Sequence, residues 1–138
     1  KNKMSKSDPS DASRINLTDT DEQIHNKIKK AKTDTKSFPI NEKDLTKRPE
    51  IQNLIGIYSS LKSQKITKTL KEFQGKNFSN FKEKLSEVVI ENISPISKEI
   101  NKLKSDRGHI LQVLKDGSEK AEIIASEKVK KIKEIIGF

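Results

Sequence analysis

The sequence predicts an all-α fold, a helical bundle with no sheet of its own. Three observations support this prediction. Apolar residues recur every three or four positions in several segments, which is the period of an amphipathic helix. Residues that typically start or stop helices flank these segments. The chain has 138 residues, enough to bury roughly two-thirds of its unfolded surface and form a modest core.

The first helix is predicted over residues 20–31. Thr20 and Gln23 have the spacing of a capping box, and the apolar residues that follow, Ile24, Ile28 and Ala31, share one face. Before this helix, residues 8–18 are predicted to form an extended connector, which contains a turn at positions 11–13 and allows a short strand around positions 15–17. The polar face of the helix carries Lys27, Lys29, Lys30 and Lys32. Such a face is usually solvated, and a phosphate-contacting role is the alternative.

The middle of the chain is predicted to contain an irregular loop and two further helices. Periodicity is absent between Thr33 and Pro49, where prolines punctuate a loop or linker. Pro49 suits the first position of a helix over residues 49–62, and its apolar positions are Ile51, Leu54, Ile55, Tyr58 and Leu61. A shorter helix is predicted over residues 67–74, ending at Gly75, which favours a left-handed conformation.

The last third of the chain is predicted to form three helices. The longest spans residues 79–104 and is expected to kink at Pro95, which cannot donate a hydrogen bond to the carbonyl of Glu91. Ser105 or Asp106 is expected to cap the next helix, which would end at Gly117. A last helix, from Ser118 to its end at Gly137, completes the pattern. The apolar side chains expected to point inward from these last two helices are Ile110, Leu111, Leu114, Ala121, Ile124, Ala125, Val129, Ile132 and Ile136.

Composition narrows the class of protein. The chain has no cysteine, which excludes disulfides and thiol catalysis, and it has no long apolar run that predicts a signal peptide or a membrane span. We therefore expect a cytoplasmic protein. Its formal net charge of +9 favours an anionic partner such as RNA. Acidic residues are interspersed throughout, so the charge supports nucleic acid binding without establishing it.

The chain opens on a lysine- and serine-rich loop, residues 1–9, which we call the KMSKS loop. Lys3, Ser5, Lys6 and Ser7 place two cations among hydroxyls, and Asp8-Pro9 then prevents the segment from continuing as a helix. Ammonium groups act as movable point charges, while hydroxyls and backbone N–H groups can surround an anion. This pattern suits a polyphosphate. A solvated N-terminal segment is the alternative if the five letters are taken alone.

Lys3-Met4-Ser5-Lys6-Ser7 resembles the loop of class I aminoacyl-tRNA synthetases that closes on the phosphates of ATP. The rest of the chain narrows the resemblance to the tryptophanyl-tRNA synthetase family of bacteria, in preference to the tyrosyl enzymes. The matching segments, in order, are 31–34, 53–59, 73–76, 81–91, 94–96 and 117–121. The match covers nearly the whole chain. The resemblance implies a C-terminal part of a longer protein, whose Rossmann domain and tryptophan pocket are missing here.

The resemblance also implies the reaction of the whole enzyme and the roles of individual residues in it. Tryptophan is activated with ATP to the adenylate and then transferred to tRNA(Trp). Lys3 and Lys6 are the implied catalytic residues, and the implied ATP- and pyrophosphate-binding residues are Lys3, Met4, Ser5, Lys6 and Ser7. No cluster has metal-ligand spacing, so Mg²⁺ is expected to be carried by the nucleotide. Tryptophan would bind the missing half, which is also expected to form most of a homodimer interface.

The family resemblance further implies that the helical part reads the tRNA anticodon. It divides the chain into the KMSKS loop and connector (1–19), a helix plus linker (20–48) and an anticodon-binding helical domain (49–138). Two clusters of polar and cationic residues are the anticodon candidates: Lys62 and Gln64, and Lys102, Lys104 and Arg107. They are expected to converge. Lysine near helix C-termini is also favoured by the helix dipole alone, so a solvated surface is the competing interpretation.

The sequence is also compatible in part with two other classes of protein. A non-catalytic RNA-binding helical module is the main alternative, and the coding sequence upstream of Lys1 would distinguish it. A coiled coil is disfavoured because the apolar pattern does not sustain heptads past the glycine and proline positions. His25 and His109 are expected to be structural or merely exposed. Phe73, Phe78 and Phe81 are assigned to packing rather than to base stacking.

Overall fold

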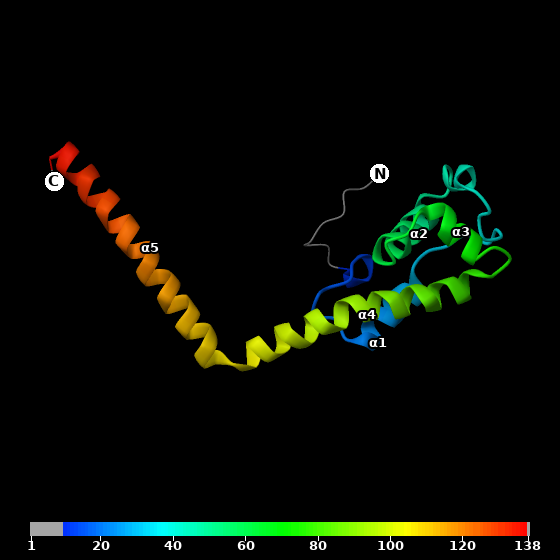
Figure 1. Cartoon of the computed structure of the whole chain (residues 1–138), viewed down its shortest axis with the longest axis horizontal. Helices are drawn as coiled ribbons and strands as arrows, with labels where there is room; N and C mark the ends of the chain where they lie inside the picture. Colours follow the sequence, from blue (N-terminus) through cyan, green and yellow to red (C-terminus); the bar gives the residue numbers. More distant parts are fainter. Residues whose placement is uncertain (1–9, 138) are drawn as a thin grey trace. The chain divides into compact units, whose positions relative to one another are not determined.

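A computed structural model describes residues 10–137 of the chain (Figure 1). These residues contain five α-helices, two short 3₁₀ turns and no strand, so the all-α prediction is confirmed. The helices are α1 Asp21–Lys30, α2 Pro49–Leu61, α3 Ile66–Glu72, α4 Phe78–Ser105 and α5 Arg107–Ile136, and the 3₁₀ turns are η1 Asp11–Ser13 and η2 Glu42–Leu45. The chain divides into two compact units, Lys1–Lys98 and Glu99–Phe138, which are described separately.

Helix α1 begins at the capping box that the sequence predicts. The Gln23 N–H donates to Thr20 Oγ1 at 3.2 Å, and the Thr20 N–H donates to Gln23 Oε1 at 2.8 Å. The turn predicted at positions 11–13 is η1. The short strand allowed around positions 15–17 does not form, because the chain turns back there, with the Asp19 N–H donating to the Asn16 carbonyl at 3.0 Å. The connector therefore folds onto α1.

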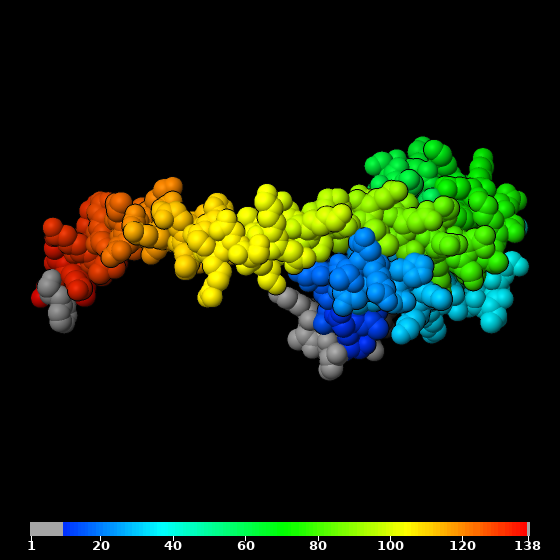
Figure 2. Space-filling view, turned by 90° about the horizontal axis from the view of Figure 1, so that it is seen from below, coloured from blue at the N-terminus to red at the C-terminus, as the bar shows by residue number. Residues whose placement is uncertain are grey.

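Four aromatic rings form the centre of the core in the first unit. Phe38, Tyr58, Phe73 and Phe81 are all nearly fully buried, and the Phe73 and Phe81 rings meet edge to face with centroids 5.0 Å apart. Phe78 packs against this cluster from a partly exposed position. The assignment of the phenylalanines to packing is therefore confirmed. Figure 2 shows α1, in blue, against the side of α4, and α1 contributes Ile24 and Ile28 to the core.

Helix α4 passes through Pro95 as one continuous element. The predicted helix over residues 79–104 is confirmed within one residue at each end. Proline removes one backbone donor, and the neighbouring turns are enough to keep the helix continuous. The bend expected at Pro95 stays a prediction.

The second unit contains the end of α4 and the whole of α5. Asp106 caps α5, with the His109 N–H donating to Asp106 Oδ1 at 2.9 Å, and Gly137 ends it in a left-handed conformation with φ of 83°. The predicted break at Gly117 and Ser118 is wrong, because α5 runs through both residues. Glycine in a helix interior costs only about 1 kcal/mol relative to alanine and removes no backbone donor.

The inward orientation predicted for the apolar side chains of α5 is also wrong for the residues described. No α5 residue is buried, and Leu111, Leu114 and Ile124 are each about two-thirds exposed. The second unit has no further layer of its own against which this stripe can pack. The periodicity therefore predicts the helix correctly but not its burial.

Candidate functional site

The residues predicted to bind ATP phosphates, Lys3, Met4, Ser5, Lys6 and Ser7, lie outside the described residues. The structure does describe the segment that directly follows the KMSKS loop. Ser10 begins it, and Asp11 begins the 3₁₀ turn η1. From here on, the connector means residues 10–20, which are the described part of the predicted connector together with the turn that leads into α1. Because the KMSKS loop is joined to the rest of the chain through Ser10, the contacts that hold the connector matter for the loop.

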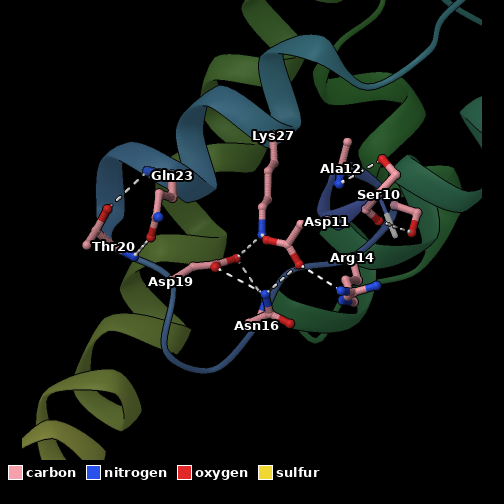
Figure 3. A network of polar contacts seen from close by, with 10 residues as sticks. Ser10, Asp11, Ala12, Arg14, Asn16, Asp19, Thr20, Gln23 and Lys27 are labelled. Atoms are coloured by element: carbon pink, nitrogen blue, oxygen red, sulfur yellow. Dashed lines mark hydrogen bonds and ion pairs between the residues drawn. The ribbon is translucent and has the colours of Figure 1, made fainter. Parts of the chain in front are cut away.

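A lysine on α1 holds the connector at two points. Lys27 Nζ donates to Asp11 Oδ2 at 2.6 Å and to Asp19 Oδ2 at 2.6 Å. The Lys27 side chain is only 15% exposed, and that of Asp19 is 6% exposed. Figure 3 shows the lysine reaching down from α1 between the two carboxylates. This arrangement ties both ends of the connector to one rigid helix.

Asn16 completes the arrangement from within the connector. Its backbone N–H donates to Asp19 Oδ2 at 2.8 Å, and its side-chain Nδ2 donates to Asp11 Oδ1 at 2.9 Å (Figure 3). Arg14 adds an ion pair to Asp11 with an N–O distance of 3.1 Å. We call Asp11, Asn16, Asp19 and Lys27 the connector anchor. Its two carboxylates receive donors on both oxygens, as partly buried charges require.

The ion pair between Lys27 and Asp11 is charged at neutral pH. Burial opposes the charged form of Lys27, but hydrogen bonds to Asp11 and Asp19 outweigh burial, so the pKa of Lys27 is raised. Hydrogen bonds from Lys27 and Asn16 lower the pKa of the Asp11 carboxyl. Both shifts favour the ion pair, so the contact persists through the neutral range.

The solvated lysine face predicted on the first helix is only partly correct. Lys29, Lys30 and Lys32 are exposed, but Lys27 is not. Lys27 lies next to Ile28 on the side of α1 that faces the core and the connector. Sequence reasoning missed it because its partner Asp11 is sixteen residues away and is brought close only by the turn at residues 16–19. The only hint in the sequence was that two aspartates, Asp11 and Asp19, precede a lysine on the first predicted helix.

The first pair of anticodon candidates lies in the turn between α2 and α3. Lys62 is exposed. Gln64 is half-buried, and its Nε2 donates to Thr69 Oγ1 at 2.9 Å and to Glu72 Oε2 at 3.2 Å. Glu72 in turn accepts from the Tyr58 hydroxyl at 2.8 Å. Both N–H donors of the Gln64 side chain therefore serve to hold this turn together.

The second set of anticodon candidates belongs to the other unit. Lys102 and Lys104 lie in the last turn of α4, and Arg107 is the first residue of α5. All three are exposed, and Lys102 Nζ lies 3.7 Å from Glu99 Oε1. Since these residues and Gln64 lie in different units, their convergence stays a prediction.

The two histidines have structural surroundings. His25 Nδ1 lies 3.1 Å from Ser86 Oγ, and His109 contributes its backbone N–H to the cap of α5. A cavity of about 310 Å³ beside His25 is also lined by Lys29 and Lys82. Lys82 Nζ donates to the Ala31 carbonyl at 2.6 Å, which closes the C-terminal end of α1. Both histidines are exposed, and their assignment to a structural role stays a prediction.

Residues 10–137 contain neither a metal centre nor a membrane span. No three or more His, Cys, Asp or Glu side chains in this part of the chain gather closely enough to hold a metal ion. None of its helices combines the length and the apolar character needed to cross a bilayer.

Comparison with known protein families identifies the class. The family described as tRNA synthetases class I (W and Y) matches residues 1–94, which include both the KMSKS loop and the connector anchor. The match covers well over half of the chain. The chain therefore belongs to the class I tRNA synthetases of this family.

Within that family, the similar proteins are tryptophan–tRNA ligases. The chain is 49% identical over 136 residues to the tryptophan–tRNA ligase of Rickettsia felis, covering 99% of this chain and 41% of that protein. It is 46% identical over 136 residues to that of Mesorhizobium japonicum, covering 99% of this chain and 38% of that protein. The predicted resemblance to tryptophanyl-tRNA synthetase is confirmed. The chain spans about two-fifths of the length of these relatives.

Proposed function

We propose that this chain serves tryptophan–tRNA ligation, supplying the ATP-phosphate loop and a helical tRNA-binding body to a longer synthetase. The observation that carries the proposal is the Lys3-Met4-Ser5-Lys6-Ser7 sequence, in a chain that is 49% identical to a tryptophan–tRNA ligase over nearly its full length. The helical core and the connector anchor support it, because they hold the residues that directly follow the KMSKS loop in the sequence.

In the proposed reaction, the tryptophan carboxylate attacks the α-phosphate of ATP, which forms tryptophanyl-adenylate and releases pyrophosphate. The amino acid then passes to tRNA(Trp). Lys3 and Lys6 neutralise the negative charge that develops on the leaving pyrophosphate, while Met4, Ser5 and Ser7 line the phosphates. Preorganised contacts of this kind contribute about 3 to 4 kcal/mol each to transition-state stabilisation. Magnesium enters with ATP as part of the substrate.

We assign tryptophan and adenosine binding to the part of a synthetase that this chain does not span. Residues 1–19 then belong functionally to the catalytic domain, residues 20–48 join it to the helical body, and residues 49–138 bind tRNA. A homodimer formed mainly by the catalytic part, and a location in the cytoplasm, complete the proposal. The 138-residue chain alone is expected to form no adenylate. If the 138-residue chain formed adenylate by itself, the assignment of tryptophan and adenosine binding to another part of the synthetase would be wrong.

The loop lysine provides the main test. Joining residues 1–138 to the remainder of the Rickettsia felis ligase yields an enzyme of full family length. In it, Lys6→Ala should lower tryptophan-dependent ATP–pyrophosphate exchange by about a hundredfold or more, with tryptophan affinity nearly unchanged. Lys84→Ala removes an exposed ion-paired lysine and is the control. Unchanged exchange in Lys6→Ala would remove the loop from catalysis and favour the non-catalytic RNA-binding alternative.

We also propose that Lys62, Gln64, Lys102, Lys104 and Arg107 contribute to anticodon binding. Changing Gln64 and Lys104 together should weaken tRNA(Trp) binding. If they contact bases, discrimination against anticodon variants should disappear; if they contact only phosphates, all variants should weaken equally and the salt dependence should decrease. Because Gln64 also holds its own turn, a thermal melt must accompany the binding measurement. Unchanged affinity and discrimination would place the anticodon elsewhere.

A further inference from the structure

We propose that Lys27 is a positioning residue for ATP activation, fixing the base of the KMSKS loop by holding Asp11 and Asp19. The inference rests on the proposed function and deepens it. Lys27 lies on α1, and its ammonium group is engaged by Asp11 and Asp19, so we assign it no contact with the reacting atoms. It acts through the connector, whose residue Asp11 stands two positions after Pro9.

The cation is fixed to a rigid part of the molecule. Ile24 and Ile28, which flank Lys27 on α1, are 0% and 4% exposed in the hydrophobic core. The capping box fixes the start of the same helix. The Lys27 side chain is itself 15% exposed, so few rotamers are open to it. Binding a carboxylate therefore costs it little conformational entropy. Lys27 is therefore a firm attachment point.

The connector contributes few buried side chains. No residue from Ser10 to Thr18 is buried, and its two large apolar side chains, Ile15 and Leu17, are 37% and 50% exposed. Asp19 is the buried member of the segment, and it is the residue that Lys27 and Asn16 contact. Because these apolar side chains are only partly covered, the polar contacts to α1 contribute substantially to holding the connector. The connector anchor supplies those contacts (Figure 3).

Placement of the connector matters for phosphate chemistry. Loop lysines stabilise a leaving pyrophosphate only when they meet it in the correct geometry, and a displacement of about 1 Å can cost about a hundredfold in rate. Releasing Asp11 frees the end of the KMSKS loop that joins the helical body. The loss should therefore fall on ATP activation, with tryptophan binding spared.

The test uses the full-length enzyme formed with the Rickettsia felis remainder. Lys27→Met keeps most of the apolar stem and removes the charge, and it should lower kcat/KM for ATP in the exchange reaction by about ten- to a hundredfold, with KM for tryptophan unchanged. Lys27→Arg, which can still bridge two carboxylates, should recover most of the activity. Lys84→Met, at an exposed ion pair on α4, is the matched control and should match the unmodified enzyme.

A second comparison separates positioning from a purely structural role. If Lys27 acts through the loop, Lys27→Met should have much less effect in an enzyme that already carries Lys6→Ala, because interacting sites are not additive. Fully additive losses, or a lowered melting temperature with ATP kinetics unchanged, would overturn the inference. Should Lys27→Met fail to fold, Asp11→Asn removes the half-exposed end of the anchor, and unchanged ATP kinetics there would overturn it equally. If the unmodified enzyme shows no tryptophan-dependent exchange, the proposed function itself fails.

Discussion

The two units of the chain carry similar apolar periodicity and use it differently. In the first unit, the stripes of α1, α2 and α4 meet around Phe38, Phe73 and Phe81, which are at most 4% exposed. In the second unit, α5 has a comparable stripe, yet none of its residues is buried. Helical spacing depends on neighbouring residues within one segment, while burial depends on a second surface. The difference shows that apolar periodicity predicts a helix but does not predict which surface, if any, buries its apolar face.

Substitutions of apolar residues should change the free energy of unfolding much more in the first unit than in the second. Phe81→Ala should lower the free energy of unfolding of the 138-residue chain by about 3 to 5 kcal/mol, because three rings lie within 5.8 Å of its ring and the cavity cannot close. Leu114→Ala, on the exposed face of α5, should change it by less than about 0.5 kcal/mol. Urea unfolding followed by circular dichroism measures both.

A large loss for Leu114→Ala would contradict the comparison. It would mean that the stripe of α5 is covered in solution. Repeating the unfolding over a range of protein concentrations identifies association between copies, because association makes the midpoint concentration-dependent.

Sequence reasoning succeeded where a short segment decides the structure. The Thr20–Gln23 capping box, proline at the first position of α2 and the end of the last helix at Gly137 are local features, and each appears as predicted. The assignment of the ATP-binding residues also rests on adjacent letters, and it stays a prediction because residues 3–7 lie outside the described part of the chain. The break at Gly117 was wrong because a helix tolerates one glycine when its backbone hydrogen bonds continue on both sides. The connector anchor was missed because it joins residues that only the tertiary fold brings together.

An ion pair between the buried Arg48 and the exposed Asp34 gives the next largest difference between the units. Arg48, 8% exposed, donates to both carboxylate oxygens of Asp34 at 2.7 Å and to the Ser37 carbonyl at 3.1 Å. Arg48→Met should cost about 1.5 to 3 kcal/mol, as expected for hydrogen bonds to charged groups. Arg107→Met, at an exposed position of the second unit, should be nearly neutral. Equal effects would show that the contacts of Arg48 contribute little.

Acid should weaken the first unit through the same contacts. Hydrogen bonds from Arg48 lower the pKa of Asp34, and hydrogen bonds from Lys27 and Asn16 lower that of Asp11. A carboxyl whose folded pKa lies below its unfolded value stabilises the fold above the unfolded value, and this contribution is lost as the pH falls through the folded value. Unfolding measured between neutral pH and about pH 3 should show this loss. In the Asp34→Asn variant the decline should be shallower, and an equal decline would exclude Asp34 as its source.

The smallest effect comes from two glycines that differ only in backbone conformation. Gly75 follows α3 with φ of +76°, while Gly117 lies inside α5, and a Cβ added at either would meet no atom within 4 Å. Because both sites are open, backbone preference alone decides the outcome. Gly117→Ala should stabilise α5 by up to about 1 kcal/mol and raise helicity at 222 nm, whereas Gly75→Ala should destabilise the first unit by about 1 to 2 kcal/mol. Opposite signs from chemically identical substitutions would confirm that α5 is continuous through Gly117. A loss of helicity in Gly117→Ala would instead support a break there, as the sequence alone suggested.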